Sequence, residues 1–66
     1  MRQVEVWYDE SEEVWTVSLC EEDGEEVRCL STHDEEADAD SAALRIAEKR
    51  GIKAYSRATH GTLSSL

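Results

Sequence analysis

Residues 14–30 read VWTVSLCEEDGEEVRCL, a pattern typical of a β-hairpin. In its first half, large apolar residues alternate with smaller or polar ones, which predicts a strand at about 13–20. Three residues share one face of that strand: Trp15, Val17 and Leu19. The acidic segment that follows contains Asp23-Gly24, a pair that tolerates the positive φ angles of tight hairpin turns. A return strand is therefore predicted at about 26–31.

A further strand is predicted upstream, at about residues 2–8. Its alternation puts three residues on one face: Val4, Val6 and Tyr8. Trp7 lies on the other face of the same strand. The polar segment 9–13 is predicted to be the turn into the next strand. Three consecutive strands joined by short turns favour an antiparallel meander.

A helix is predicted after the third strand. Thr32 and Glu35 have the spacing of a capping box, in which a hydroxyl and a carboxylate bond free N–H groups at the helix start. Acids occupy the first turns and bases the last turns, as the helix dipole favours: Asp34, Glu35, Glu36 and Asp38, then Arg45, Lys49 and Arg50. Gly51 stands where a C-terminal cap belongs. The predicted sheet-facing stripe consists of Ala37, Ala43, Leu44 and Ala47, with Ile46 beside it.

Residues 52–59 alternate like a strand and either pair with the sheet as a short fourth strand or trail from it. Residues 60–66 contain Gly and Ser and are predicted to be a flexible tail. The expected order is βββαβ. Strands followed by a helix predict an α+β fold, a three-stranded antiparallel meander with one helix on one face, as a single domain over residues 1–59.

The 66-residue length limits the function that the chain can carry. Domains of this size bury only about 60% of the surface of their unfolded chains, so one thin core leaves little room for a substrate pocket. No run of 18 apolar residues is present, and the first residues resemble a strand more than a signal peptide. We therefore expect a cytoplasmic protein, located in the host cytoplasm if it is phage-encoded.

Charge is distributed unevenly along the chain. The net charge is −9, but residues 1–40 hold 15 acids and two bases, whereas residues 41–66 hold one acid and five bases. Acidic surfaces often serve only solubility. An asymmetry between the two halves instead favours electrostatic recognition of a partner.

The predicted meander brings two acidic segments together. The turn at 9–13 and the end of the third strand lie at the same end of the sheet, so the acidic helix start lies there too. The residues predicted to form this edge are Asp9, Glu10, Glu12, Glu13, Asp34, Glu35, Glu36, Asp38 and Asp40. Duplex DNA carries about one negative charge per 1.7 Å of axis, so a rigid acidic edge can occupy a surface that binds DNA. The acids at 21–26 are expected to face the basic end of the helix and to be partly neutralised.

Other chemistry has little support in the sequence. Cys20 and Cys29 flank the hairpin and are expected on the same sheet face, directly opposite or diagonal depending on the turn centre. Two free thiols are expected there rather than a disulfide. These cysteines with His33 and His60 lack zinc-ligand spacing, and no nucleophile has an evident base and supporting group. We therefore expect no catalytic residues, no metal and no cofactor.

Trp7 is the remaining candidate for binding. It lies on the face that the helix does not cover, where either the C-terminal segment packs over it or an apolar patch is left for a partner. In the second case Trp7 would be a central binding residue, for a partner protein or for a second copy of the chain.

Two resemblances accompany these patterns. Trp15-Thr16-Val17, Ser31-Thr32, Glu35-Glu36-Ala37, Ile46-Ala47 and His60-Gly61 are arranged as in small bacterial βββαβ domains of unknown function. The size and charge resemble those of acidic phage-encoded anti-CRISPR proteins that act as DNA mimics. The second resemblance implies a partner, the DNA-binding surface of a CRISPR surveillance complex or its nuclease.

The sequence thus predicts a non-enzymatic inhibitor that is a monomer or weak dimer, does not bind nucleic acid itself, and uses its acidic edge on a basic partner protein. Two alternatives remain open. One is an acidic housekeeping domain of a halophile, and the other is a homodimeric module joined through the Trp7 face.

Overall fold

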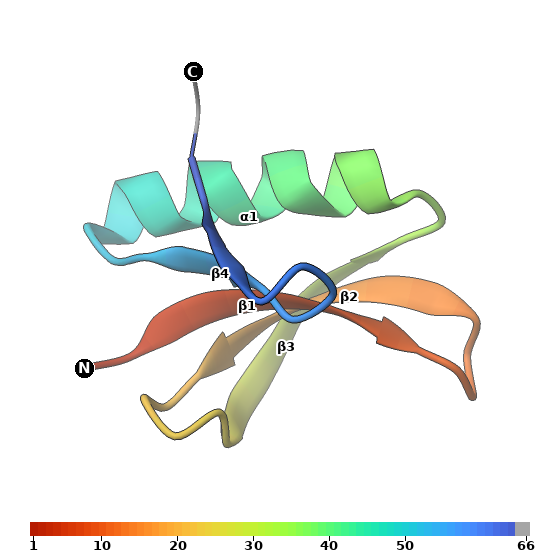
Figure 1. Cartoon of the computed structure of the whole chain (residues 1–66), viewed down its shortest axis with the longest axis horizontal. Helices are drawn as coiled ribbons and strands as arrows, with labels where there is room; N and C mark the ends of the chain where they lie inside the picture. The colour runs from red at the N-terminus through yellow and green to blue at the C-terminus, as the bar shows by residue number, and fades with distance from the viewer. Residues whose placement is uncertain (65–66) are drawn as a thin grey trace.

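Five strands and one helix are present in the computed structural model, which describes residues 1–64. They are β1 Gln3–Asp9, β2 Val14–Cys20, β3 Glu26–His33, α1 Glu36–Arg50, β4 Ala54–Ser56 and β5 Gly61–Leu63. The strands form one sheet in the spatial order β3-β2-β1-β4-β5. The helix α1 lies along one face of this sheet (Figure 1). We call the opposite sheet face the open face, since no helix covers it.

The first three strands form the antiparallel meander that their pattern predicts. Val4 pairs with Leu19, and Val6 pairs with Val17, so the apolar residues of β1 and β2 share the helix-facing side. Val4, Val6 and Val17 are fully buried and form one cluster with the helix. The core is therefore one thin layer between α1 and the centre of the sheet.

The helix packs on this layer through methyl groups. Its buried residues are Ala39, Ala42, Ala43 and Ala47, which let the helix backbone approach the sheet closely. Ala37, predicted on the packed stripe, is exposed. The reason is helix geometry, since two residues correspond to roughly 200° of rotation and place Ala37 almost opposite Ala39.

The predicted capping box is wrong. The helix begins at Glu36 with Glu35 as its N-cap residue, and no side chain bonds the cap. Thr32 and His33 instead extend β3, where they pair with Thr16 and Trp15. Thr32 is therefore part of the sheet, three residues before the N-cap position.

The helix ends as predicted. Gly51 has φ 67° and ψ 34°, which is the left-handed conformation of a C-terminal cap. The N–H groups of Gly51 and Ile52 donate to the carbonyl oxygens of Glu48 and Ala47. These two bonds close the last turn before the chain enters β4.

The sheet is mixed, not purely antiparallel. Strand β4 lies within the segment predicted at 52–59 and pairs in parallel with β1. A parallel neighbour requires a long crossover, which α1 supplies between β3 and β4. Residues 61–63, predicted to lie in a tail outside the domain, form β5 against β4 after a turn at His60, whose φ is 55°. Residues 65 and 66 of that predicted tail lie outside the described residues.

Two register shifts interrupt the β2–β3 pairing. Ser18 pairs with Cys29 and Cys20 pairs with Glu26, so Cys20 and Cys29 are diagonal neighbours. Both thiols are free, with Cys20 buried and Cys29 exposed. Leu30 is the extra residue at the first shift and packs against the core cluster.

Candidate functional site

The two acidic segments lie at the same end of the sheet. Strand β1 ends and β2 begins at the 9–13 turn, and β3 ends at His33, which pairs with Trp15 next to that turn. The turn and the start of α1 therefore occupy one end of the molecule, at the right of Figure 1. We call this region the acidic end, and it contains Asp9, Glu10, Glu12, Glu13, Asp34, Glu35, Glu36, Asp38 and Asp40.

The turn at the acidic end is held by Asp9. Its Oδ1 accepts hydrogen bonds from the Ser11 hydroxyl at 2.8 Å, from the Ser11 N–H at 3.0 Å and from the Glu12 N–H at 3.3 Å. The Ser11 hydroxyl and these N–H groups lower the pKa of the Asp9 carboxyl. Glu13 completes the turn in the left-handed region, with φ 57°. The turn therefore presents its carboxylates on a hydrogen-bonded loop.

No ion pair within residues 1–64 involves an acid of the acidic end. Six of its nine acids are exposed: Glu10, Glu12, Glu13, Asp34, Glu35 and Asp38. Glu36 and Asp38 also lie in the first turn of α1, where the helix dipole favours negative charge. The helix thus offsets part of the repulsion that these carboxylates exert on one another.

Asp40 differs from the other acids of this end. It is half-buried, and its Oδ1 is buried without a hydrogen-bond partner among the described residues. Burial, together with the charge of Glu36, raises the pKa of the Asp40 carboxyl. Asp40 therefore adds less to the exposed charge than its place in the sequence suggests.

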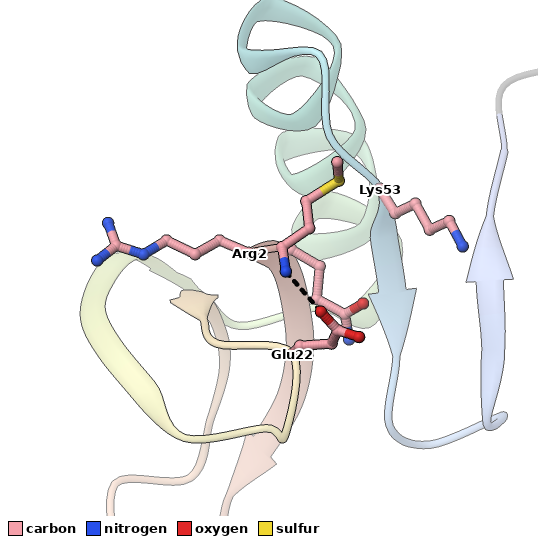
Figure 2. A pocket seen from close by; sticks show the side chains of 5 residues that line it. Arg2, Glu22 and Lys53 are labelled. Carbon is pink, nitrogen blue, oxygen red and sulfur yellow. Dashed lines mark hydrogen bonds and ion pairs between the residues drawn. The ribbon is translucent and has the colours of Figure 1, made fainter.

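Two of the five acids at residues 21–26, at the opposite end of the sheet, have ion-pair partners. The N-terminal ammonium of Met1 lies 2.5 Å from Glu22 Oε2, and Arg2 Nε lies 3.5 Å from Glu21 Oε2. Figure 2 shows Arg2, Glu22 and Lys53 around a hollow at this end. The hollow has a volume of about 170 Å³, and Met1 also lines it. The ammonium, with a smaller contribution from Lys53, lowers the pKa of Glu22. We call this region the paired end.

The acids at 21–26 were predicted to be partly neutralised, but by other residues than those that pair with them in the structure. The sequence assigned this neutralisation to the basic end of α1, whereas the ion pairs come from the N-terminal residues Met1 and Arg2. The cause is the position of β1 beside β2, which sets the start of the chain next to the β2–β3 turn. The strand order of the meander therefore causes the difference in ion pairing between the two ends.

Arg57 covers part of Trp7 on the open face. Its guanidinium carbon lies 5.5 Å from the centre of the Trp7 ring, close enough for a cation–π contact. The C-terminal segment thus packs over Trp7, which was one of the two predicted possibilities, and leaves it half-buried. Trp7 Nε1 donates to Ser18 Oγ at 3.1 Å, which fixes the ring on the sheet.

Arg57 also neutralises a buried carboxylate. Glu5 is only 3% exposed, and Arg57 Nε donates to its Oε1 at 2.5 Å, while Gln3 donates to its Oε2 at 2.8 Å. A second Arg57 nitrogen donates to the Gly24 carbonyl at 3.0 Å. Burial alone would lower the pKa of Arg57, but the hydrogen bond and charge of Glu5 outweigh it and raise the pKa. This pair ties the end of β4 to β1 and to the hairpin turn.

One signal for this pair is present in the sequence. Glu5 is a charged residue inside a strand of otherwise apolar character, a place where an ionised side chain needs a partner. Its partner is 52 residues away, and only the parallel β1–β4 pairing brings it close.

Cys20 is unsuited to nucleophilic chemistry. Its burial, with the charge of Glu5, raises the pKa of the thiol, while Arg57 acts weakly in the other direction. Reactive cysteines instead need a depressed pKa and access to solvent. Within residues 1–64, no three His, Cys, Asp or Glu side chains are grouped as metal ligands.

Comparison of the chain with protein-family models, with curated proteins and with solved structures found no match. In the part of the chain that the structure describes, no helix has the length and apolar character needed to cross a bilayer. The geometry and charge of the acidic end are therefore the basis on which a function is proposed.

Proposed function

We propose that this protein acts without catalysis, by binding a basic nucleic-acid-binding surface of a partner protein through the acidic end. One observation carries the proposal. Among residues 1–64 the acids of this end have no ion-pair partner, whereas Glu21 and Glu22 at the paired end have partners of their own. Unpaired carboxylates concentrated at one end complement a cluster of Lys and Arg from another protein.

The physical properties of this end suit competition with nucleic acid. Its charges lie on two rigid supports, a hydrogen-bonded turn and the first turns of a helix that is packed on the sheet. A preorganised charged surface associates quickly and loses affinity as salt rises, since screening acts over roughly 8–10 Å at physiological ionic strength. The same salt dependence governs the phosphate contacts that it would replace.

An inhibitor is the role that follows from such binding. A bound acidic end blocks the surface that the partner uses for DNA, as a DNA mimic does. An anti-CRISPR protein that keeps a CRISPR complex or nuclease from its target DNA is the leading instance of this class. The side chains near the open face do not suggest an enzyme, since Cys20 is buried with a raised pKa and the hollows of residues 1–64 are shallow.

The test is a pull-down from lysates of candidate hosts, with competition by duplex DNA and by salt. Two variants of equal net charge are compared with the natural chain. The acidic-end variant changes five residues to Gln: Glu10, Glu12, Glu13, Glu35 and Glu36. The paired-end variant changes five others to their amides: Glu21, Glu22, Asp23, Glu25 and Glu48.

We expect the natural chain and the paired-end variant to retain the same nucleic-acid-binding protein, and DNA to displace it. The acidic-end variant should retain little of it. Equal retention by both variants would show that net charge, not this end, carries the binding. If nothing that DNA displaces is retained by the natural chain, the proposal is wrong.

A further inference from the structure

A hollow of about 250 Å³ lies on the open face next to the acidic end. Strands β1, β2 and β3 and the 9–13 turn all contribute to it. The lining includes Trp7, Asp9, Glu12, Thr16, Glu26 and Cys29. Its volume is below the roughly 300–1,000 Å³ of pockets for drug-sized ligands, so it suits a single side chain.

Thr16 in this hollow has an unsatisfied hydroxyl. The residue is 4% exposed, and its Oγ1 has no hydrogen-bond partner among the described residues. Ser18, two residues further along β2, shows the usual situation, because its buried hydroxyl accepts from Trp7 and donates to Glu26. Most buried polar side-chain atoms have a partner, so the Thr16 hydroxyl indicates a group that is supplied from outside.

The charges around the hollow define that group as a cation. Asp9, Glu12 and Glu26 contribute carboxylates, and no basic side chain lines the hollow. The hydrogen bonds of Asp9 use its Oδ1, and that of Glu26 uses its Oε2. The second oxygen of each carboxylate is free of hydrogen bonds to residues 1–64. Acceptors are thus present on several sides, with the Trp7 ring as an apolar wall.

We propose that this hollow receives the guanidinium of an arginine side chain from the basic partner, an inference that rests on the proposed function. A guanidinium has five N–H donors spread over a planar group, which matches acceptors that lie apart. The acids lining the hollow do not group as metal ligands. Trp7 already holds one guanidinium, that of Arg57, near its ring.

The direct test is an NMR titration of the whole chain at low ionic strength. The probes are three blocked pentapeptides with Arg, Lys or Gln in the centre of four glycines. We expect the Arg peptide to shift the Trp7 indole and Thr16 amide signals, the Lys peptide to shift them less, and the Gln peptide to leave them unchanged. Equal shifts with Arg and Lys, or shifts only outside the hollow, would overturn the proposal.

A single substitution tests whether the Thr16 hydroxyl contributes to binding of the Arg peptide. Thr16→Val keeps the shape and replaces the hydroxyl with a methyl group. This should weaken Arg-peptide binding about tenfold, the usual effect of losing a hydrogen bond to a charged group. Thr62→Val is the matched control, since Thr62 is also a threonine in a strand but is exposed and outside the hollow. Thr16→Val should melt no lower than the natural chain, because the hydroxyl has no partner to lose.

Glu12→Gln keeps the proposal testable if Thr16→Val fails to fold, since Glu12 is exposed in the turn. It should also weaken Arg-peptide binding. Full binding by Glu12→Gln and by a folded Thr16→Val would refute the role of the hollow. The pull-down separates the two proposals, because a partner retained through the acidic end but insensitive to Thr16→Val leaves the proposed function standing without the arginine site.

Discussion

Gly51 shows how one backbone conformation can matter more than the space around it. Its φ is 67°, and a Cβ added there would meet nothing within 4 Å. The left-handed conformation itself costs an L-residue roughly 1–2 kcal/mol, and the loss of freedom in the unfolded chain returns only part of this. Gly51→Ala should therefore destabilise the protein by about 1 kcal/mol, which lowers the Tm by roughly 4–8 °C in a chain of this size.

Gly61→Ala is the control for that change. Gly61 is outside the left-handed region, and its Cβ would lie at an ordinary 3.7 Å from the Thr59 side chain. Thermal unfolding followed by circular dichroism should show no loss of stability for Gly61→Ala. Equal losses in both variants would mean that packing, not backbone conformation, is responsible.

Asp40 is predicted to destabilise the folded protein at neutral pH. Its folded pKa is raised above the ordinary value of 3.8, so folding favours the protonated carboxyl. The penalty for ionised Asp40 is absent below the unfolded pKa and complete above the folded pKa, so it grows as pH rises through that window. Asp40→Ala should stabilise the protein by about 1 kcal/mol at pH 7, the low end of the cost of an unsatisfied buried group.

Asp38→Ala provides the comparison, since Asp38 lies in the same region of α1 but is exposed. Both changes gain helix propensity. Urea unfolding at neutral and at acid pH should show a larger gain for Asp40→Ala at pH 7, with the difference between the variants shrinking in acid. A difference that does not change with pH would contradict a role for the Asp40 charge.

At the scale of elements, alternation and turn residues were sufficient to predict β1, β2 and β3. The apolar faces of β1 and β2 were assigned correctly because period-two patterns determine which side chains share a face. The capping-box prediction failed because Thr32 and Glu35 have two possible roles. Local spacing favours a cap, but the partner strand β2 continues to Trp15 and its pairing extends β3 to His33.

Strands β4 and β5 show a limit of local pattern. Each has only three residues, too few for alternation to show which strand it pairs with. The stability of β4 depends on β1, a partner distant in sequence, and β5 then depends on β4. The alternation of residues 52–59 allowed a fourth strand to be considered, but it did not indicate parallel pairing with β1, and nothing in residues 60–66 indicated β5.

The packing of α1 leads to a prediction about its alanines. Ala43 is fully buried against the sheet, whereas Ala37 is exposed on the far side of the helix. Ala43→Leu should force the helix away from the sheet and destabilise the protein by roughly 1–3 kcal/mol. Ala37→Leu adds the same atoms in solvent and should stay within about 0.5 kcal/mol of the natural chain. Denaturant unfolding of both variants measures this, and similar stabilities would place the packed face elsewhere.

At the scale of the molecule, the sequence allowed the acidic end to be predicted, because its position follows from strand order alone. Any antiparallel meander puts the 9–13 turn and the end of the third strand together. The Arg57–Glu5 pair depends instead on the parallel pairing of β4 with β1. The hollow around Thr16 depends on the register of β1, β2 and β3. Both features join residues that are distant in sequence, and no local pattern predicts such a combination.

The different pairing of the two ends predicts how stability depends on salt. At low ionic strength the Debye length is about 30 Å, so the acids of the acidic end repel one another, whereas at 1 M salt it is about 3 Å and the repulsion is screened. Changing the turn acids Glu10, Glu12 and Glu13 to Gln should therefore raise the Tm by a few degrees at low salt. Changing Glu21, Glu22 and Glu25 removes the same charge but also two ion pairs, so it should raise the Tm little or not at all.

Melting curves across a KCl series measure this difference. The turn variant should gain less from added salt than the natural chain, because less repulsion remains to be screened. The natural chain itself should fold without molar salt, since α1, the meander and the Arg57–Glu5 pair do not depend on screening. If the natural chain unfolds at low salt and both triple variants gain equally, the acids act as one hydrated surface, as in a halophilic protein, and the distinction between the two ends has no energetic meaning.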